Sequence, residues 1–514
     1  MKKYILVVSL FTGSSIYAQV PEDALRYSFF PQNGTARNQA IGGAMGSLGG
    51  DITAPYVNPA GLGFYKTKEI VFSAGFLLNE NKTTFRDNNS IKTNAGFTIG
   101  TGGLIFGFSS TKKQGISNAI SFTITQTANF NNHIQYKGLN NYSSFSEQFA
   151  EEFAKSGYSI NEVLSTNSPL PFSSAPALFT YLIDTVKING VYQVKAAPEY
   201  ILDAGQALRQ EMDQRTKGGI HELSMSFAHN RKDKWLYGLS ISIPYINYSN
   251  LTNFKESDTS SNTSNYFNHF EYTDDYKTTG SGFIARLGVI YRPVDYIRLG
   301  LAVHTPTWMF LTEKRTTTLS TQLENPVASF NTSSATFTNN EPGENKYTQV
   351  TPMKVMLSAS YVFREVSDVK KQRAFITADV EYVHYKGFRF TNDNKNPTAN
   401  DKAYYSALNN VVKAEYKGAF NYRVGGELKF NTIMARLGFA WYGNPYKDAA
   451  FKASKMLLSG GLGYRNKGMF IDLTYVHSIS KDVNFPYRLA DRANTFATVK
   501  QQKGNVMLTV GFKF

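Results

Sequence analysis

The chain has 514 residues, of which 42% are hydrophobic, 14% aromatic and 18% charged, and its formal net charge is +15. It contains no cysteine, which excludes a disulfide scaffold, thiol catalysis and any Cys-ligated metal site. The chain has no run of about 18 apolar residues, which excludes helical membrane spans. Its length exceeds that of one ordinary domain unless the domain is a large all-β barrel.

The first residues have the order of a secretory signal peptide. Lys2 and Lys3 precede a short apolar stretch that begins at Tyr4, and small residues lead to Ala18. This order predicts a signal peptide over residues 1–18, with an apolar part too short to span a bilayer. We expect no nucleic-acid partner for an exported chain. The basic charge of an exported chain favours anionic lipid or the phosphates of lipopolysaccharide as partners, unless the basic loops only keep the surface soluble.

Strict alternation of apolar and polar residues is the strongest pattern in the chain. In the last ten residues, Val506, Leu508 and Val510 fall on one face and polar residues on the other, which is typical of a β-strand. Near the segment 421–430 the polar face carries three charges. Such a face cannot lie in a dry core without a large cost, but it can line a barrel lumen while the apolar face meets lipid.

Fourteen segments share this alternation, an even number as in single-chain bacterial barrels. Their connections alternate between short ones, such as 231–234, and long ones, such as 250–279 and 312–346. Short turns at one end and long loops at the other are typical of an outer-membrane barrel. We therefore predict an all-β fold, a 14-stranded antiparallel transmembrane β-barrel over residues 69–514, with strands near 69–79, 93–110, 117–131, 218–230, 235–249, 280–292, 295–311, 347–363, 373–389, 419–430, 432–444, 453–465, 468–480 and 503–514.

Two regions do not follow the strand pattern. Residues 19–68 hold the densest glycine in the chain, which favours a compact N-terminal hatch, or plug, inside the barrel. The loop 132–217 is too long to lack structure, and helices are expected around 145–153 and over 176–183 and 200–215 because their apolar residues recur at helical spacing. We assign external capture of a hydrophobic ligand to part of this loop, unless its apolar side chains only pack on one another; the residues concerned are Phe149, Phe153, Phe179 and Leu182.

Several short motifs stand out, of which the most specific are Asn58-Pro59-Ala60 and the Arg-Pro-Val-Asp turn at 292–295; the full set lies at 23–28, 34–37, 42–51, 58–63, 291–300, 304–308, 351–352 and 379–383. These motifs resemble those of the FadL-type (OMPP1) family of long-chain fatty acid transporters. The resemblance implies a fourteen-stranded barrel closed by a hatch, and passive uptake of hydrophobic molecules that leave sideways through the wall beside a kinked third strand. It assigns hatch gating at that kink to Asn58, Pro59, Ala60 and Gly61. The third predicted strand departs from the family pattern, because Asn118 to Asn129 contain neither glycine nor proline.

Apolar residues on inward strand positions distinguish the lumen from that of an aqueous porin, whose inward face is mostly polar. These residues need either the hatch or a hydrophobic ligand to pack against. The candidates for ligand binding are Ile284, Ile290, Met356, Val362 and Phe470. Arg286 and Arg298 are inward cations that could hold a ligand carboxylate, although such groups often pair with one another or with hatch residues such as Asp51.

Other functions fit the sequence less well. The seven histidines show no nucleophile elbow and no His-Glu-x-x-His motif, so we predict no enzymatic activity, no metal site and no cofactor. A haem receptor would need axial ligands, for which only His133 and His269 in external loops are suitable. A role as a partner-binding accessory of protein secretion is the remaining alternative. We expect a monomer in the outer membrane of a Gram-negative bacterium, with a small hydrophobic ligand.

Overall fold

The structure is a computed structural model that describes residues 21–514, apart from 110–114, 189, 325–326, 364–372, 394–395, 449–450 and 452. The predicted signal peptide, residues 1–18, lies outside the described residues. Within the described part of the chain, no helix is long and apolar enough to cross a membrane.

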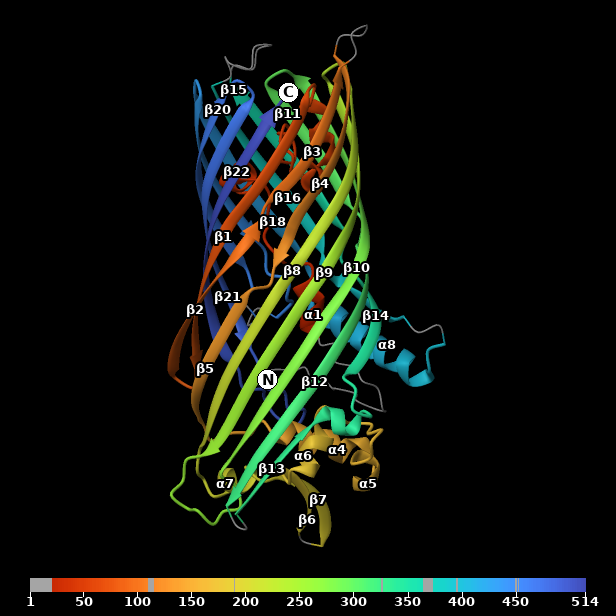
Figure 1. The fold of residues 1–514 in the computed structure, drawn as a ribbon, viewed down its shortest axis with the longest axis vertical. Helices are drawn as coiled ribbons and strands as arrows, with labels where there is room; N and C mark the ends of the chain where they lie inside the picture. Colours follow the sequence, from red (N-terminus) through yellow and green to blue (C-terminus); the bar gives the residue numbers. More distant parts are fainter. Residues whose placement is uncertain are drawn as a thin grey trace, which may run out of the picture.

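The described strands form one closed, antiparallel β-barrel of 14 wall strands, as predicted (Figure 1). β1 and β22 pair with each other and close it. Nine wall strands are single elements, and five are built from two consecutive elements: β2 with β3, β4 with β5, β11 with β12, β14 with β15, and β16 with β17. The wall elements are β1 (Lys68–Phe85), β2 (Asn88–Ile99), β3 (Thr101–Ser109), β4 (Ile116–Asn129), β5 (Asn132–Asn140), β8 (Leu208–Arg231), β9 (Trp235–Asp258), β10 (His269–Val294), β11 (Ile297–His304), β12 (Trp308–Glu324), β14 (Gly343–Val350), β15 (Lys354–Phe363), β16 (Ala374–His384), β17 (Arg389–Asn392), β18 (Gly418–Phe430), β19 (Ile433–Tyr442), β20 (Lys455–Asn466), β21 (Met469–Asn484) and β22 (Ala497–Lys513).

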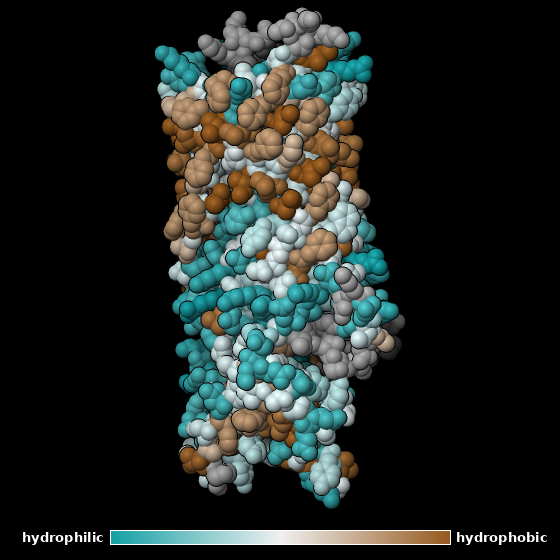
Figure 2. Space-filling model, turned by 45° about the vertical axis from the view of Figure 1, so that its right-hand side comes forward, coloured by the Kyte–Doolittle hydropathy of each residue, from teal (hydrophilic) through white to brown (hydrophobic). Residues whose placement is uncertain are grey.

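An apolar belt crosses the face of the barrel shown in Figure 2, in its upper half, and each wall strand has exposed large apolar side chains. Outward side chains such as Phe72, Phe76 and Leu78 on β1 are about half exposed. So many large apolar side chains exposed together would be unfavourable in water. A belt of this kind on a closed barrel is the surface that meets lipid. The belt lies toward the end that carries the C-terminus, and the surface toward the opposite end is mostly polar.

Several wall strands extend further beyond the belt than the sequence indicated. β8 and β9 each have 24 residues and β10 has 26, whereas the alternation predicted strands of 13 to 15 residues there. Beyond the belt both faces contain polar side chains, for example Asn250 on the inward face and Asn247 on the outward face. The apolar alternation therefore stops before the strand does.

The segment from 141 to 207, here called the cap, closes the polar end of the barrel (Figure 1). It contains α4 (Glu147–Ser156), α5 (Ile160–Val163), α6 (Ser174–Phe179), the hairpin of β6 (Ile183–Ile188) and β7 (Val191–Ala196), and α7 (Glu199–Asp203). The helix expected over 200–215 is wrong, because α7 ends at Asp203 and β8 begins at Leu208. The buried side chains Leu208, Gln210 and Met212 alternate along β8, which pairs with β9. The helix expected over 176–183 likewise ends at Phe179, before β6.

Three further elements lie in the other connections at this end. β13 (Val327–Ser333) forms a hairpin with β12, η2 (Ser334–Phe337) follows it, and η4 (Tyr385–Gly387) leads into β17. α8 (Ala399–Glu415) was not predicted. Its start has a sequence signal that could have indicated it, since Thr398 and Asp401 form a reciprocal capping box.

Residues 21–64 lie inside the barrel and form α1 (Pro21–Arg26), α2 (Ala36–Ala40), α3 (Ala54–Val57) and η1 (Pro59–Phe64). Nearly all residues from 34 to 63 are buried. The wall provides space for this segment at glycines: a Cβ added at Gly238, Gly288, Gly300, Gly425 or Gly438 would overlap atoms of residues 41 to 60. Atoms of this segment therefore lie directly against the backbone of the wall, which is possible only where the wall residue is glycine.

Candidate functional site

Asn58 fastens the segment inside the barrel to the wall. Its Nδ2 donates to the carbonyl of Gly46 (2.6 Å) and lies 3.3 Å from that of Val289 in β10, while its Oδ1 accepts the N–H of Ala60 (3.1 Å). Asn58 also fills the space over Gly288. The expectation that this motif lies at a kink in the third wall strand is therefore corrected: Asn58 lies against β10 and β11, and Pro59 and Ala60 lie over Gly238 of β9. Gly61 faces inward, against Gly49 and Ala54 of the same segment.

A cavity of about 110 Å³ lies between this segment and the wall. Its lining combines aromatic and apolar side chains with charged ones. An apolar cavity of about 150 Å³ accommodates benzene, so this cavity is close to the size of one small aromatic ring and far smaller than a long acyl chain. The lining includes Tyr27, Phe30, Ile284, Arg286, Met356 and Lys354.

Of the seven lumen residues predicted to bind ligand, three line this cavity: Ile284, Arg286 and Met356. The others pack on the segment inside the barrel. Ile290 belongs to a buried cluster with Ala60, and Val362 to one with Ile41 and Met45.

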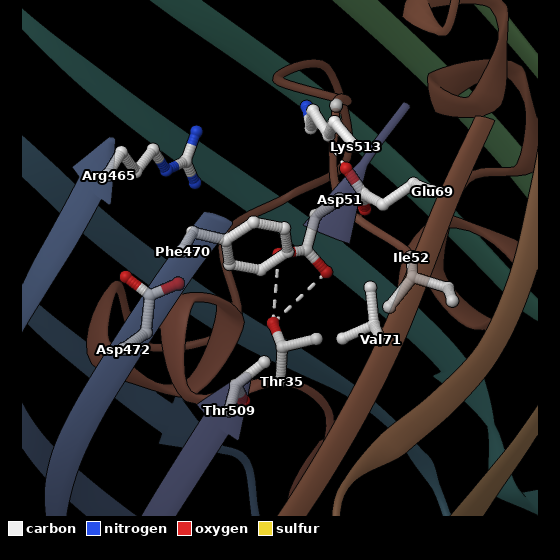
Figure 3. Close-up of a pocket in the computed structure, with 11 residues that line it drawn as sticks. Thr35, Asp51, Ile52, Glu69, Val71, Arg465, Phe470, Asp472, Thr509 and Lys513 are labelled. Atoms are coloured by element: carbon white, nitrogen blue, oxygen red, sulfur yellow. Dashed lines mark hydrogen bonds and ion pairs between the residues drawn. The ribbon is translucent and has the colours of Figure 1, made fainter. Parts of the chain in front are cut away.

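Phe470 lies at a separate, much smaller recess of about 10 Å³ (Figure 3). In that recess the hydroxyl of Thr35 donates to both oxygens of Asp51 (3.0 and 2.9 Å), and the Phe470 ring lies beside this pair. The recess leaves no room for a ligand, so Phe470 supports the inner segment.

Both arginines predicted to hold a ligand carboxylate are already engaged. Arg286 forms a bidentate ion pair with Glu222, one arm of which measures 3.0 Å. The Glu222 carboxylate therefore occupies the place that a ligand carboxylate would take. Arg298 donates to the carbonyl of Leu48 and lies 4.4 Å over the ring of Phe64. Arg423, which also lines the cavity, pairs with Glu381 at 3.2 Å.

Lys354 is the cavity cation for which the described residues provide no ion pair. Its ammonium lies 5.7 Å over the ring of Phe30. The alternation placed Lys354 on an inward face, but nothing in the sequence distinguished it from Arg286. Glu381, the carboxylate that attracts this ammonium, is already paired with Arg423. The ammonium can therefore attract the polar end of a bound molecule without breaking an ion pair.

The wall is discontinuous between its second and third strands. The ladder between β3 and β4 ends at Thr101 and Thr125. Among the described residues, no ladder joins β2 to β4 or β5, and the register between β4 and β8 shifts between Gln126 and Ala128. We call this junction, on the cap side of Thr101 and Thr125, the seam.

Side chains bridge the seam where the ladder stops. Asn33, from the segment inside the barrel, donates its Nδ2 to the carbonyls of Ile99 (2.8 Å) and Gln126 (2.6 Å). The Oε1 of Gln126 accepts the N–H of Ile99 (3.0 Å). The cavity lining includes Asn33, Thr125 and Thr127, so the cavity reaches the seam.

The break in the third wall strand needs neither glycine nor proline. Oδ1 of Asn129 accepts the N–H of Asn131 (3.0 Å), which turns the chain between β4 and β5. Asparagine favours such local turns because its side chain bonds the backbone two residues on. The asparagines from 129 to 132 were the signal that the sequence reasoning missed.

Three of the four residues assigned to external capture are buried. Phe149, Phe153 and Leu182 belong to the core of the cap, and the Phe149 ring lies 5.5 Å from that of Phe145. Only Phe179 is exposed, at 43%, with its ring 6.0 Å from that of Phe337. The structure therefore matches the alternative in which these side chains pack on one another.

Two carboxyl groups, of Glu256 and Glu147, are buried where the cap meets the wall. Glu256, in the part of β9 beyond the apolar belt, accepts bonds from the N–H of Phe145 (3.1 Å) and the amide of Gln210 (2.6 Å). Burial raises the pKa of Glu256 to about 7 despite these bonds. Burial also raises the pKa of Glu147 in α4 to about 7.

The two histidines that a haem receptor would need are engaged elsewhere. Nε2 of His133 lies 2.9 Å from Asp213, and Nδ1 of His269 lies 2.7 Å from Asn268. No group of three or more His, Asp or Glu side chains in the described ranges could hold a metal ion.

Fold and site together define a transmembrane β-barrel plugged from within, with a small cavity between plug and wall. No family model matches the chain, and no curated protein matches it. Among solved structures, the chain is similar to the Pseudomonas putida toluene transporter TodX, with a TM-score of 0.51, 12% identity, and 94% of this chain and 99% of that chain covered. It is also similar to a Pseudomonas aeruginosa FadL homologue, with a TM-score of 0.51, 13% identity, and 93% and 98% covered. At this identity the likeness shows the fold, and the fold expected from the FadL-type resemblance is confirmed.

Proposed function

We propose that the protein is an outer-membrane channel for passive uptake of small hydrophobic compounds. The observation that carries this proposal is a cavity of about 110 Å³ that extends from the plug to an unladdered seam in the wall. This volume is much closer to that of one aromatic ring than to that of a long acyl chain. A long-chain fatty acid would need residues 21–64 to move, so it is the less favoured substrate. The solved structures of similar fold include a toluene transporter.

The route that we propose has three stages. A hydrophobic molecule enters past the cap, occupies the cavity beside Ile284 and Met356, and leaves sideways through the seam between Ile99 and Gln126. Asn33 holds the seam closed, since its side chain bonds both carbonyls there. No energy source is needed, because the compound moves from water to lipid down its own free-energy gradient.

Uptake of labelled toluene and of labelled oleate by Gram-negative cells that carry the protein in their outer membrane, compared with cells that lack it, tests this function. Ile284→Trp adds an indole to the cavity, and we expect it to abolish most toluene uptake. Leu287→Trp on the same strand is the matched control, because Leu287 is 56% exposed on the lipid-facing side. Equal uptake by the two variants would contradict the cavity route. Faster uptake of oleate than of toluene would assign the protein to long acyl chains.

A second candidate function is docking of a protein partner, as an accessory of secretion. It is supported by the tip of the β6–β7 hairpin, where Val191 is 61% and Tyr192 73% exposed, far from the apolar belt. Deletion of residues 184–195 separates the two candidates. If the deletion variant loses a co-purified protein but keeps toluene uptake, docking is favoured. If the same proteins co-purify with the variant and with the full chain, this hairpin is excluded as a docking site.

A further inference from the structure

Three lysines stand side by side on the outside of the barrel, on β1, β22 and β21. Lys82 is directly opposite Lys500, and Lys500 is directly opposite Lys481. All three side chains are exposed. Directly opposed residues of antiparallel strands have Cβ atoms about 4.5–5.5 Å apart, so three positive charges share one short row.

Repulsion between the three lysines of this row destabilises the protein when no anion is bound. Like charges at directly opposed positions destabilise a sheet, and none of the three lysines makes an ion pair with a described residue. Two carboxylates lie close by on these strands: Glu80 is opposite Gln502, one outward position closer to the belt, and Asp482 follows Lys481 on the other face of β21. Neither of these described residues forms an ion pair with the three lysines. An external anion would remove the repulsion.

Lysines on the other side of the barrel show the contrasting arrangement. Lys314 of β12 lies directly opposite Glu344 of β14, and their ion pair measures 3.3 Å. Lys346 pairs with the same carboxylate at 3.0 Å, and Lys255 pairs with Glu271 at 2.7 Å. Those lysines are neutralised within the protein, whereas the row on β1, β22 and β21 is not.

The position of the row indicates which anion would lie there. Leu78, four residues before Lys82 on the same outward face, is 54% exposed in the apolar belt. Four residues of a tilted strand rise about 10 Å along the barrel axis. The headgroup layer extends about 5–8 Å beyond the hydrocarbon on each side, and a lysine can direct its long side chain back to that depth. The three ammonium groups therefore reach the level of lipid phosphates.

We propose that Lys82, Lys481 and Lys500 bind the phosphate of a phosphorylated glycolipid, of the lipopolysaccharide type, in the outer leaflet. The assignment to that leaflet rests on the proposed function, which places the cap outside the cell. The phosphate neutralises the row. The acyl chains of the glycolipid lie along the apolar belt, against Leu78, Tyr475 and Val506, which are 54%, 50% and 41% exposed. The site holds a structural lipid and takes no part in the uptake route.

The test compares two triple variants of the full-length protein in mild detergent. K82Q/K481Q/K500Q removes the row, and K255Q/K314Q/K346Q removes the same charge from lysines that have carboxylate partners. The probe is purified lipopolysaccharide, with bound lipid counted by native mass spectrometry and affinity measured by titration. One lysine near an anionic membrane surface contributes about 1 kcal/mol, or about a five-fold change. We therefore expect a loss of roughly a hundred-fold for the first variant and little change for the second.

Two further measurements identify the source of the phosphate. Dephosphorylated glycolipid should bind as weakly to the natural chain as intact glycolipid binds to the row variant, and millimolar inorganic phosphate should not displace the lipid. Equal loss in both triple variants, or competition by inorganic phosphate, would overturn the proposal. Toluene uptake, measured separately for the same variants in a membrane, should be unchanged in the row variant. Failure of lipid binding is thereby distinguished from failure of the channel function.

Discussion

The shape and charge of the cavity depend on individual residues, and most of these residues contact partners that are far away in the sequence. The alternation placed Arg286 and Arg298 on the inward face, but not their partners, because Glu222 lies 64 positions from Arg286 and Leu48 lies 250 from Arg298. The sequence therefore predicts which face a residue occupies better than which group it meets. Ile290, Val362 and Phe470 illustrate the same limit, since the segment inside the barrel covers them.

Replacing Asn33 tests the seam at the scale of one residue. Asn33→Ala removes two hydrogen bonds to wall carbonyls, each of which contributes about 0.5–1.5 kcal/mol. We expect the amide of Ile99 to exchange with deuterium about ten-fold faster or more, and toluene uptake to rise.

Asn88→Ala is the matched control, because its side chain only caps an exposed turn at Arg86. If the two variants had the same exchange rate at Ile99, Asn33 would not hold the seam.

Whole elements were predictable where one face meets lipid and unpredictable elsewhere. All fourteen wall strands follow from the alternation, since each has outward apolar residues at the belt. The outer part of β8 was mistaken for a helix, because Leu208 and Met212 are spaced four apart and the polar Gln210 between them is also buried. The break between β4 and β5 was missed because turns there depend on asparagine and not on glycine or proline.

The buried carboxyls predict that the cap responds to pH. An unfolded Glu has a pKa of about 4.3, and burial raises that of Glu256 to about 7. A raised pKa in a folded carboxyl means that its contribution to stability is fully present below about pH 4.3 and is lost as the pH rises through about 7. The cap should therefore be more protected from hydrogen exchange at pH 5 than at pH 8, with α4 as the reporter.

Glu256→Gln keeps the hydrogen-bonding shape and removes the ionisation. The pH dependence of exchange in α4 should become shallower in this variant, leaving the part that Glu147 contributes. An unchanged slope would show that ionisation of Glu256 does not loosen the cap.

At the scale of the whole molecule, wall and plug are fitted to each other through glycines. Gly288→Ala would place a methyl group on the side-chain oxygen of Asn58. We expect the plug to be displaced, the barrel to unfold at a lower temperature, and small polar solutes to leak into liposomes.

Gly460→Ala is the control, because the nearest atom to its added methyl lies 3.5 Å away, an ordinary contact. Leakage through both variants would mean that any added methyl group loosens the wall, and that the plug is not seated by its glycines.

The same close fit sets an order for assembly. The contacts over Gly238, Gly288, Gly300, Gly425 and Gly438 come from wall strands spread along the chain, from β9 to β19. The barrel itself closes only when β22, the last strand made, pairs with β1, the first. Because the wall leaves no spare room at these five positions, we expect the plug to be in place before the two ends of the sheet are joined.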